Sequence, residues 1–126
     1  MHIFLGGKVQ DFKKLLVWQK SHLLTLEIYS ISKSLPNNEL FGLTSQLRRA
    51  SSSVAANIAE GCGRKSKNEF AHFLAIAIGS LSEVEYFLIL ARDLNYLSKN
   101  DFQRINSLAN ETKRMLISFV NRVEKQ

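Results

Sequence analysis

An all-α fold, an antiparallel up-down bundle of four helices, is expected from this sequence on three grounds. Long segments place apolar residues at alternating steps of three and four, which keeps those residues on one face of a helix. The 126 residues include six glycines and one proline, so few positions would interrupt a helix. No segment alternates apolar and polar residues over the length of a β-strand. Because the connections between the helical segments are short, consecutive helices are expected to lie antiparallel.

The first helix is expected from about Lys14 to Ser34. Two apolar stripes follow it, one of Leu15, Trp18, His22 and Tyr29 and a second of Leu16, Leu23 and Leu26. Two stripes predict a helix that packs on two sides, within a bundle or across a subunit interface. The helix should end at Leu35-Pro36, because the residue before a proline disfavours helical geometry. Residues 1–12 are expected to form a flexible arm, and residues 13–126 a single domain.

The second helix is expected from Leu40 to Gly61 and contains many small residues. Its apolar face consists of Leu40, Leu43, Leu47, Ala50 and Val54. Small side chains on its other faces allow neighbouring helices to approach closely. The sequence Gly61-Cys62-Gly63 is typical of a helix end.

The third helix should begin at a capping box, Ser66 to Glu69, in which each side chain satisfies a backbone N–H of the other residue. Its predicted core face is a regular heptad of Phe70, Leu74, Ala77, Leu81, Val84, Leu88 and Ala91. Further apolar residues lie off that face: Phe73, Ile76, Ile78, Phe87 and Ile89. Apolar surface around much of a helix indicates that it is enclosed or that it contacts another subunit, so we expect a homo-oligomer.

The fourth helix follows Asn95, which should end the third, and it opens with a second capping box, Ser98 to Asp101. Leu97 and Phe102 have the spacing of a hydrophobic staple. The predicted core stripe is Phe102, Ile105, Ala109, Thr112, Leu116, Phe119 and Val123.

Composition restricts the classes of function. The formal net charge of +6 and the pI near 9.7 favour a polyanionic partner such as RNA or DNA. A single cysteine, Cys62, excludes an intrachain disulfide and a cluster of thiolate metal ligands, and it fits a reducing cytoplasm. The apolar run Phe70–Leu81 is shorter than the roughly 20 residues of a membrane span, so no membrane association is expected.

Basic residues supply the candidate nucleic-acid site. The first group is Arg48, Arg49, Arg64, Lys65 and Lys67, and a second group on the fourth helix is Lys113, Arg114, Arg122 and Lys125. The two arginines of the second helix lie some 20 Å from the loop that follows it, given the rise of about 1.5 Å per residue. A polymer, but no single phosphate, would span that distance. The alternative is a set of solvated charges and structural ion pairs.

Other residues that can carry chemistry have structural interpretations. Glu60 and Arg64 have the spacing of an ion pair, and with Gly61 they are expected to hold the turn after the second helix. Glu69 and His72 form a single Glu-x-x-His, whereas di-iron bundles need two such motifs and two more glutamates. Neither a metal nor a cofactor is therefore expected.

Cys62 has Arg64 nearby, which would make its thiol somewhat acidic, but it lacks a catalytic partner in the sequence. Aromatic residues at heptad-like spacing are expected in the core or in an interface and not as base-stacking platforms; they are Trp18, Tyr29, Tyr86 and Tyr96.

Four pieces of the chain carry a family resemblance: LLVWQKSHLLTLEIY (15–29), ELFGLTSQLRRA (39–50), NIAEGCGRKS (57–66) and EFAHFLAIAIGSLSEVEYFLILARDLNYL (69–97). In them the sequence resembles the four-helix bundle proteins encoded in bacterial 23S rRNA intervening sequences. That family is similar to the accessory proteins of diversity-generating retroelements. The resemblance implies a four-helix protomer assembled as a ring, typically a pentamer. In the retroelement relatives it implies a basic surface for nucleic acid and a reverse transcriptase as partner.

Residues and resemblance together predict a non-enzymatic, cytoplasmic homo-oligomer that binds RNA or DNA through backbone phosphates. Little sequence specificity is expected, because no base-reading motif is present. The alternative is a ring-shaped scaffold for another protein, such as a reverse transcriptase, without a direct role in nucleic-acid binding.

Overall fold

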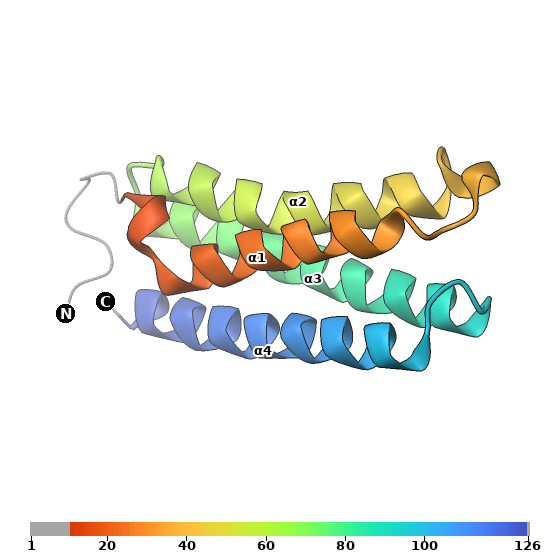
Figure 1. Cartoon of the computed structure of the whole chain (residues 1–126). Helices are drawn as coiled ribbons and strands as arrows, with labels where there is room; N and C mark the ends of the chain where they lie inside the picture. The colour runs from red at the N-terminus through yellow and green to blue at the C-terminus, as the bar shows by residue number, and fades with distance from the viewer. Residues whose placement is uncertain (1–10, 126) are drawn as a thin grey trace.

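The computed structural model describes residues 11–125. Within that range the chain forms four α-helices, two single-turn 3-10 helices and no β-strand. The elements are η1 (Phe12–Lys14), α1 (Leu16–Ser32), η2 (Asn37–Glu39), α2 (Leu43–Cys62), α3 (Lys67–Asp93) and α4 (Lys99–Glu124). The four α-helices lie side by side (Figure 1), which confirms the expected all-α class and number of helices.

Each helix packs against two neighbours and lies diagonally across from the third. The backbone of α2 lies next to those of α1 and α3, and the backbone of α4 also lies next to those of α1 and α3, whereas the described backbones of α1 and α3 are not close neighbours. The connection between α2 and α3 lies at the end of the bundle where α1 begins and α4 finishes (Figure 1). The connections α1–α2 and α3–α4 lie at the opposite end.

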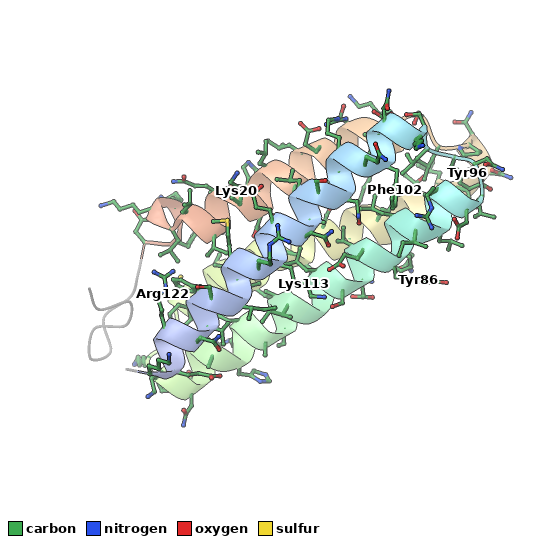
Figure 2. The ribbon with its side chains drawn as sticks, turned by 90° about the horizontal axis from the view of Figure 1, so that it is seen from below. Lys20, Tyr86, Tyr96, Phe102, Lys113 and Arg122 are labelled. Atoms are coloured by element: carbon green, nitrogen blue, oxygen red, sulfur yellow. The ribbon has the colours of Figure 1, made fainter. Side chains whose placement is uncertain are left out.

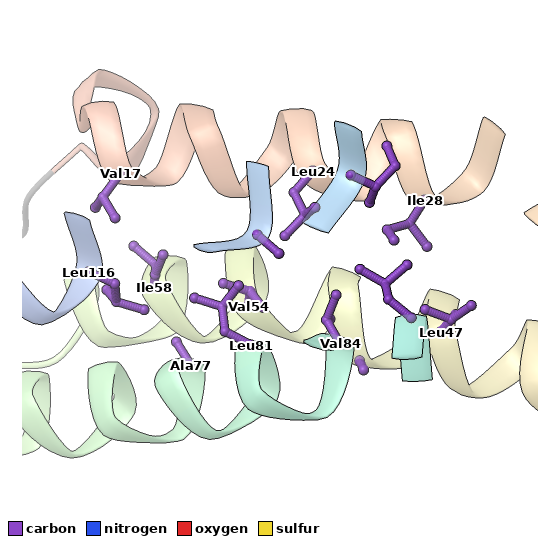
Figure 3. Packing of buried hydrophobic residues seen from close by; sticks show 14 of the residues in the cluster. Val17, Leu24, Ile28, Leu47, Val54, Ile58, Ala77, Leu81, Val84 and Leu116 are labelled. Carbon is purple, nitrogen blue, oxygen red and sulfur yellow. The ribbon is translucent and has the colours of Figure 1, made fainter. Parts of the chain in front are cut away.

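The residues that α3 and α4 contribute to the core include all the predicted ones. All seven heptad positions of α3 and all seven positions of the α4 stripe are buried. Leu81 from α3 and Leu116 from α4 are completely inaccessible, and they lie beside Val54 and Ile58 of α2 respectively (Figure 3). Regular spacing therefore identified the buried faces of these two helices correctly.

Neither of the two predicted stripes is the face that α1 buries within the protomer. The residues that α1 buries are Val17, Ser21, Leu24, Ile28, Ile31 and Ser32. Leu16, Leu23 and Leu26 are instead exposed, Leu16 at 61% and Leu26 at 54%. His22 and Tyr29 are exposed as well, while Leu15 and Trp18 are half-buried. The error has a physical cause: α1 is apolar on nearly every side, so spacing alone cannot choose the face that meets α2 and α4.

Helix ends follow the local capping chemistry. The Ser66 and Ser98 hydroxyls accept hydrogen bonds from the N–H groups of Glu69 and Asp101, each at 3.1 Å. Asn95 adopts a left-handed φ of 62° after α3, which ends that helix as predicted.

Helix α2 differs from its prediction at both ends. Residues 37–39 form η2, and Leu40, expected in the core of α2, lies before the helix and is exposed. Gly61, expected at the helix end, lies inside it, and Gly63 is the C-cap. The first helix is also shorter than predicted, because Leu15 is extended and α1 begins only at Leu16.

Helix α3 is the most apolar described helix. With 27 residues and a mean hydropathy of 1.8 over its most apolar 18-residue window, it is long and apolar enough to cross a membrane. That window includes Glu83 and Glu85, the two charged residues that end the uninterrupted apolar run predicted at Phe70–Leu81. Its heptad face is buried against α2 and α4, as in the core helix of a bundle, but only 33% of that window is buried within the protomer.

Candidate nucleic-acid interface

Three basic segments meet at one end of the bundle. They are η1, the connection from α2 to α3, and the last turn of α4 (Figure 1). Contacts of η1 with α1 and α2, and an edge-to-face contact of Phe70 with Phe119 at 6.0 Å, hold these segments together. Their basic residues, which we call the basic end, are Lys13, Lys14, Arg64, Lys65, Lys67, Arg122 and Lys125.

Arg64 is held by both an ion pair and an aromatic ring. Its Nη2 lies 3.4 Å from the Glu60 carboxylate, and its guanidinium stacks 4.7 Å from the centroid of the Phe73 ring. The expected ion pair is therefore present, and it spans the C-terminus of α2. The buried Nε has no hydrogen-bond partner among the described residues. Arg64 thus presents a fixed guanidinium plane, with about 41% of its side chain exposed.

The lysines around Arg64 carry charge that no neighbouring carboxylate neutralises. Within residues 11–125, neither Lys65 nor Lys67 forms an ion pair, and the same is true of Lys13 and Lys14. Lys65 is exposed and Lys67 is half-buried at the first position of α3. Exposed cations without partners keep their full attraction for a polyanion.

Arg48 and Arg49 lie apart from the basic end and from each other. Arg48 turns toward α1, where its Nε donates to Ser32 Oγ at 2.8 Å and its guanidinium lies 4.8 Å from the Tyr29 ring centroid. Arg49 turns toward α3 and forms a 3.0 Å ion pair with Glu83. The structure therefore does not join these two arginines and the loop into one surface.

The cations of α4 are also separated. Lys113 lies midway along the bundle and forms a 3.1 Å ion pair with Glu85 of α3 (Figure 2). Arg114 is exposed and has no ion pair in the described chain. Arg122 lies near the end of α4, with its guanidinium 5.7 Å from the Phe119 ring centroid, so it belongs to the basic end (Figure 2).

Gly61 and Trp18 serve the packing of the fold, as expected. A Cβ on Gly61 would lie 3.0 Å from Phe70 Cδ1 and 3.2 Å from Phe73 Cβ, so α2 and α3 approach too closely for a larger residue. Trp18 stacks on His22 with centroids 5.2 Å apart and meets the edge of Phe12 at 5.0 Å. The tryptophan thus anchors Phe12, a residue expected in the arm; residues 1–10 of that arm lie outside the described residues.

Cys62 is not an acidic thiol. Burial, with a smaller contribution from Asp11, raises its pKa from 9.0 to about 11. Desolvation disfavours the thiolate more strongly than Arg64 can favour it. The expected acidification is therefore wrong.

Metal coordination finds no support in the described part of the chain. No group of three or more His, Cys, Asp or Glu residues is arranged to hold an ion there. His72 packs edge-on against Phe73 at 5.5 Å, and His22 stacks on Trp18.

Lys13 and Lys14 were missed as candidates in the sequence. They follow Asp11, whose side chain accepts a 3.1 Å hydrogen bond from the Lys13 N–H and so starts η1. The sequence feature that could have identified them is a pair of basic residues shortly after Asp11, a residue type that commonly caps a helix. Only the fold brings it to the α2–α3 connection, which is some fifty residues away in the sequence.

Comparisons with known proteins give one consistent result. The family model described as 23S rRNA-intervening sequence protein matches residues 13–118. A crystal structure from Bacteroides thetaiotaomicron, described as a protein with unknown function from the S23 ribosomal protein family, is similar at 30% identity. Its TM-score is 0.78, and the match covers 83% of this chain and 98% of that one. No curated protein matches.

Proposed function

Because this chain belongs to the 23S rRNA-intervening sequence protein family, we propose that it is a cytoplasmic, non-enzymatic ring that binds nucleic acid through its basic end. The observation that carries this proposal is the set of cations without ion pairs around Arg64. Phosphate contacts of this kind give affinity without reading sequence, so the bound RNA or DNA is recognised mainly by its charge.

The chemistry of the basic end supports a polymer and not a small substrate. Its cations come from three segments and face outward from the end of the bundle, whereas an enzyme site needs groups that converge on one reacting atom. Arg64 supplies a rigid plane that can pair with a phosphate or stack on a base, and the lysines supply mobile charges beside it.

A ring is supported by apolar faces on the two diagonal helices. Helix α1 exposes Leu16, Leu23 and Leu26, and α3 exposes Ile76, Tyr86 and Ile89. Tyr86 projects away from the bundle (Figure 2) and is 57% exposed. Exposed apolar surface of this extent on opposite sides of one domain is typical of subunit contacts.

The two faces differ from each other, and that difference bears on the symmetry. A two-fold dimer uses the same patch on both copies, whereas the pairing of one face with a different face passes from copy to copy and forms a ring when the rotation between copies closes. We therefore propose that the α1 face of one copy packs on the α3 face of the next, in an antiparallel up-down bundle. The pentamer typical of the family is the expected size.

The test is fluorescence anisotropy of the purified protein with a structured RNA and with a duplex DNA across a salt series. Replacing Arg64, Lys65 and Lys67 with glutamine should weaken binding and reduce the log–log salt slope by about 2–3, close to one per lost phosphate contact. The control replaces Arg49, Lys113 and Arg114 with glutamine, which removes the same charge elsewhere. Equal losses in both triple variants, with assembly intact, would show that the basic end has no special role.

A protein scaffold is the second candidate, and one observation favours it. Phe41, between η2 and α2, is 93% exposed, and Leu40 and Leu94 are exposed at the same end of the bundle. A bond from the Tyr96 hydroxyl to Glu39 at 3.1 Å ties the two connections of that end together. A protein such as a reverse transcriptase could dock there. Stoichiometric co-purification of a protein that Phe41→Ser abolishes, with nucleic acid removed by a high-salt wash, would favour this function.

A further inference from the structure

A pocket of about 90 Å³ lies at the corner between the end of α1 and the start of α2, away from the basic end. Its walls come from Ser32, Lys33, Leu35, Pro36, Asn37, Leu40, Thr44 and Arg48. Sites that enclose drug-sized molecules occupy roughly 300–1,000 Å³, so only a small group fits in this one.

The polar lining of the pocket is cationic. Lys33 and Arg48 line it, and neither forms an ion pair with a described residue. The carboxylate of the intervening η2 is occupied elsewhere: the oxygens of Glu39 accept from the Leu43 N–H at 3.2 Å and from the Tyr96 hydroxyl at 3.1 Å. No acidic residue contributes to the walls, so the pocket favours an anion.

Arg48 is held in place without using all its donors. Its Nε donates to Ser32 Oγ at 2.8 Å, and its guanidinium lies 4.8 Å from the Tyr29 ring centroid. Among the described residues no acceptor engages its two terminal nitrogens. A guanidinium that is fixed on one edge and open on the other suits the oxygens of a phosphate.

Thr44 adds a polar group to the same lining. This residue is 97% buried, at 3% exposure, and it lines the pocket, yet its hydroxyl has no hydrogen-bond partner in residues 11–125. The Thr44 oxygen is not one of the fully buried side-chain atoms that lack a partner, so it is open to the pocket and is available to a ligand there. A phosphate oxygen beside Arg48 would accept that hydrogen bond.

We infer that this corner pocket binds one phosphate group, through Arg48, Lys33 and the Thr44 hydroxyl. Two sources share that chemistry: free inorganic phosphate and the terminal phosphate of an oligonucleotide. The inference goes beyond the proposed function, because the pocket lies apart from the basic end. A phosphate can occupy the pocket whether or not a polymer binds at the basic end.

The experiment is isothermal titration of the full-length protein with sodium phosphate, against sodium chloride at equal ionic strength. One saturable site per protomer is expected. Arg48→Gln should weaken phosphate binding about ten-fold or more, as expected for a lost charge-assisted hydrogen bond. The matched control is Arg49→Gln, the adjacent residue that faces α3, which should change the affinity less than about two-fold.

Thr44→Val keeps the inference testable if Arg48→Gln does not fold. It removes only the hydroxyl and should weaken phosphate binding several-fold while leaving the circular dichroism spectrum unchanged. The absence of a saturable site up to millimolar phosphate would overturn the inference. So would equal losses in Arg48→Gln and Arg49→Gln, since these would reflect overall charge.

A competition distinguishes the two sources. Displacement of phosphate by a 5′-phosphorylated oligonucleotide, but not by its unphosphorylated twin, would identify a terminal phosphate as the ligand. If neither oligonucleotide displaces phosphate, the ligand is the free ion. The glutamine variant of Arg64, Lys65 and Lys67 should bind phosphate normally, so failure of the basic end and failure of the pocket give different results.

Discussion

Substitution of Gly79 by alanine tests the proposed ring because the protomer and the assembly should respond in opposite directions. Gly79 lies in the interior of α3, where glycine is about 0.8–1.0 kcal/mol less favourable than alanine. A Cβ built at Gly79 has no atom within 4 Å, so the protomer itself has room for alanine. Gly79→Ala should therefore stabilise an isolated protomer by about 1 kcal/mol, roughly 3–6 °C in Tm for a domain of this size.

The interface should respond with the opposite sign. Gly79 is seven residues before Tyr86 and three after Ile76, so all three lie on the outer face of α3. If a helix of the next copy packs across that face, the new methyl group fills space needed for close approach. An overpacked contact is typically destabilised by about 1–3 kcal/mol, which is about a 5-fold to 150-fold loss of association.

Two measurements separate these effects. Sedimentation velocity over a concentration series measures the fraction of assembled protein. Thermal unfolding by circular dichroism, at protein concentrations below the dissociation constant of the assembly, measures the stability of the protomer. The expected result is a smaller fraction of assembled protein together with a higher protomer Tm. Unchanged assembly with a raised Tm would refute the interface on α3, and a lowered protomer Tm would refute the helix-propensity argument.

Gly61→Ala is the matched control, with the opposite effect on the protomer. At Gly61 the new Cβ would lie 3.0 Å from Phe70 Cδ1 and 3.3 Å from the Phe70 carbonyl oxygen. Phe70 is completely buried and its backbone is fixed in α3, so the neighbours cannot yield easily. Overpacking of about 1–3 kcal/mol should exceed the gain in helix propensity and lower the Tm.

Three further outcomes are expected. Leu23→Glu, on the exposed face of α1, should abolish assembly in sedimentation velocity with little change in helix content, whereas Leu24→Glu, one residue along and fully buried, should prevent folding. Because the Cys62 pKa is raised to about 11, its reaction with a thiol reagent at pH 9 should be about fifty-fold slower than that of an unfolded-chain thiol. The same shift means that the folded state holds a proton the unfolded chain has released, so stability should fall as pH rises from about 9 to 11, and Cys62→Ala should flatten that decline. Ser66→Ala and Ser98→Ala should each lower the free energy of unfolding by about 1 kcal/mol in urea titrations. If neither substitution changes the free energy of unfolding, the capping hydrogen bonds described above do not stabilise the helices.

Local sequence determined most of the secondary structure and half of the core. Helix α4 has a polar side that contrasts with a regular apolar one, and α3 has a heptad without interruption. Spacing therefore identified every buried position in these two helices except Ser80, a small polar residue that it could not single out. Their starts at Ser66 and Ser98 depend on a serine hydroxyl that accepts from the backbone N–H three residues later, and such short-range contacts can be recognised from sequence. The same is true of the Glu60–Arg64 ion pair, one helical turn apart.

The tertiary structure alone decided which side of α1 faces inward and which cations lie together. Leu23 and Leu24 are equally apolar, and only the positions of α2 and α4 make one exposed and the other buried. Arg48 and Arg49 are adjacent in sequence, yet the angle of about 100° between successive helical residues sends one to the phosphate pocket and the other to Glu83. The basic end likewise unites Lys13 with Lys65 only because the helices return to the same end of the bundle. Local interactions are determined by residues that are close in the sequence, whereas contacts across the fold depend on the geometry with which the helices pack.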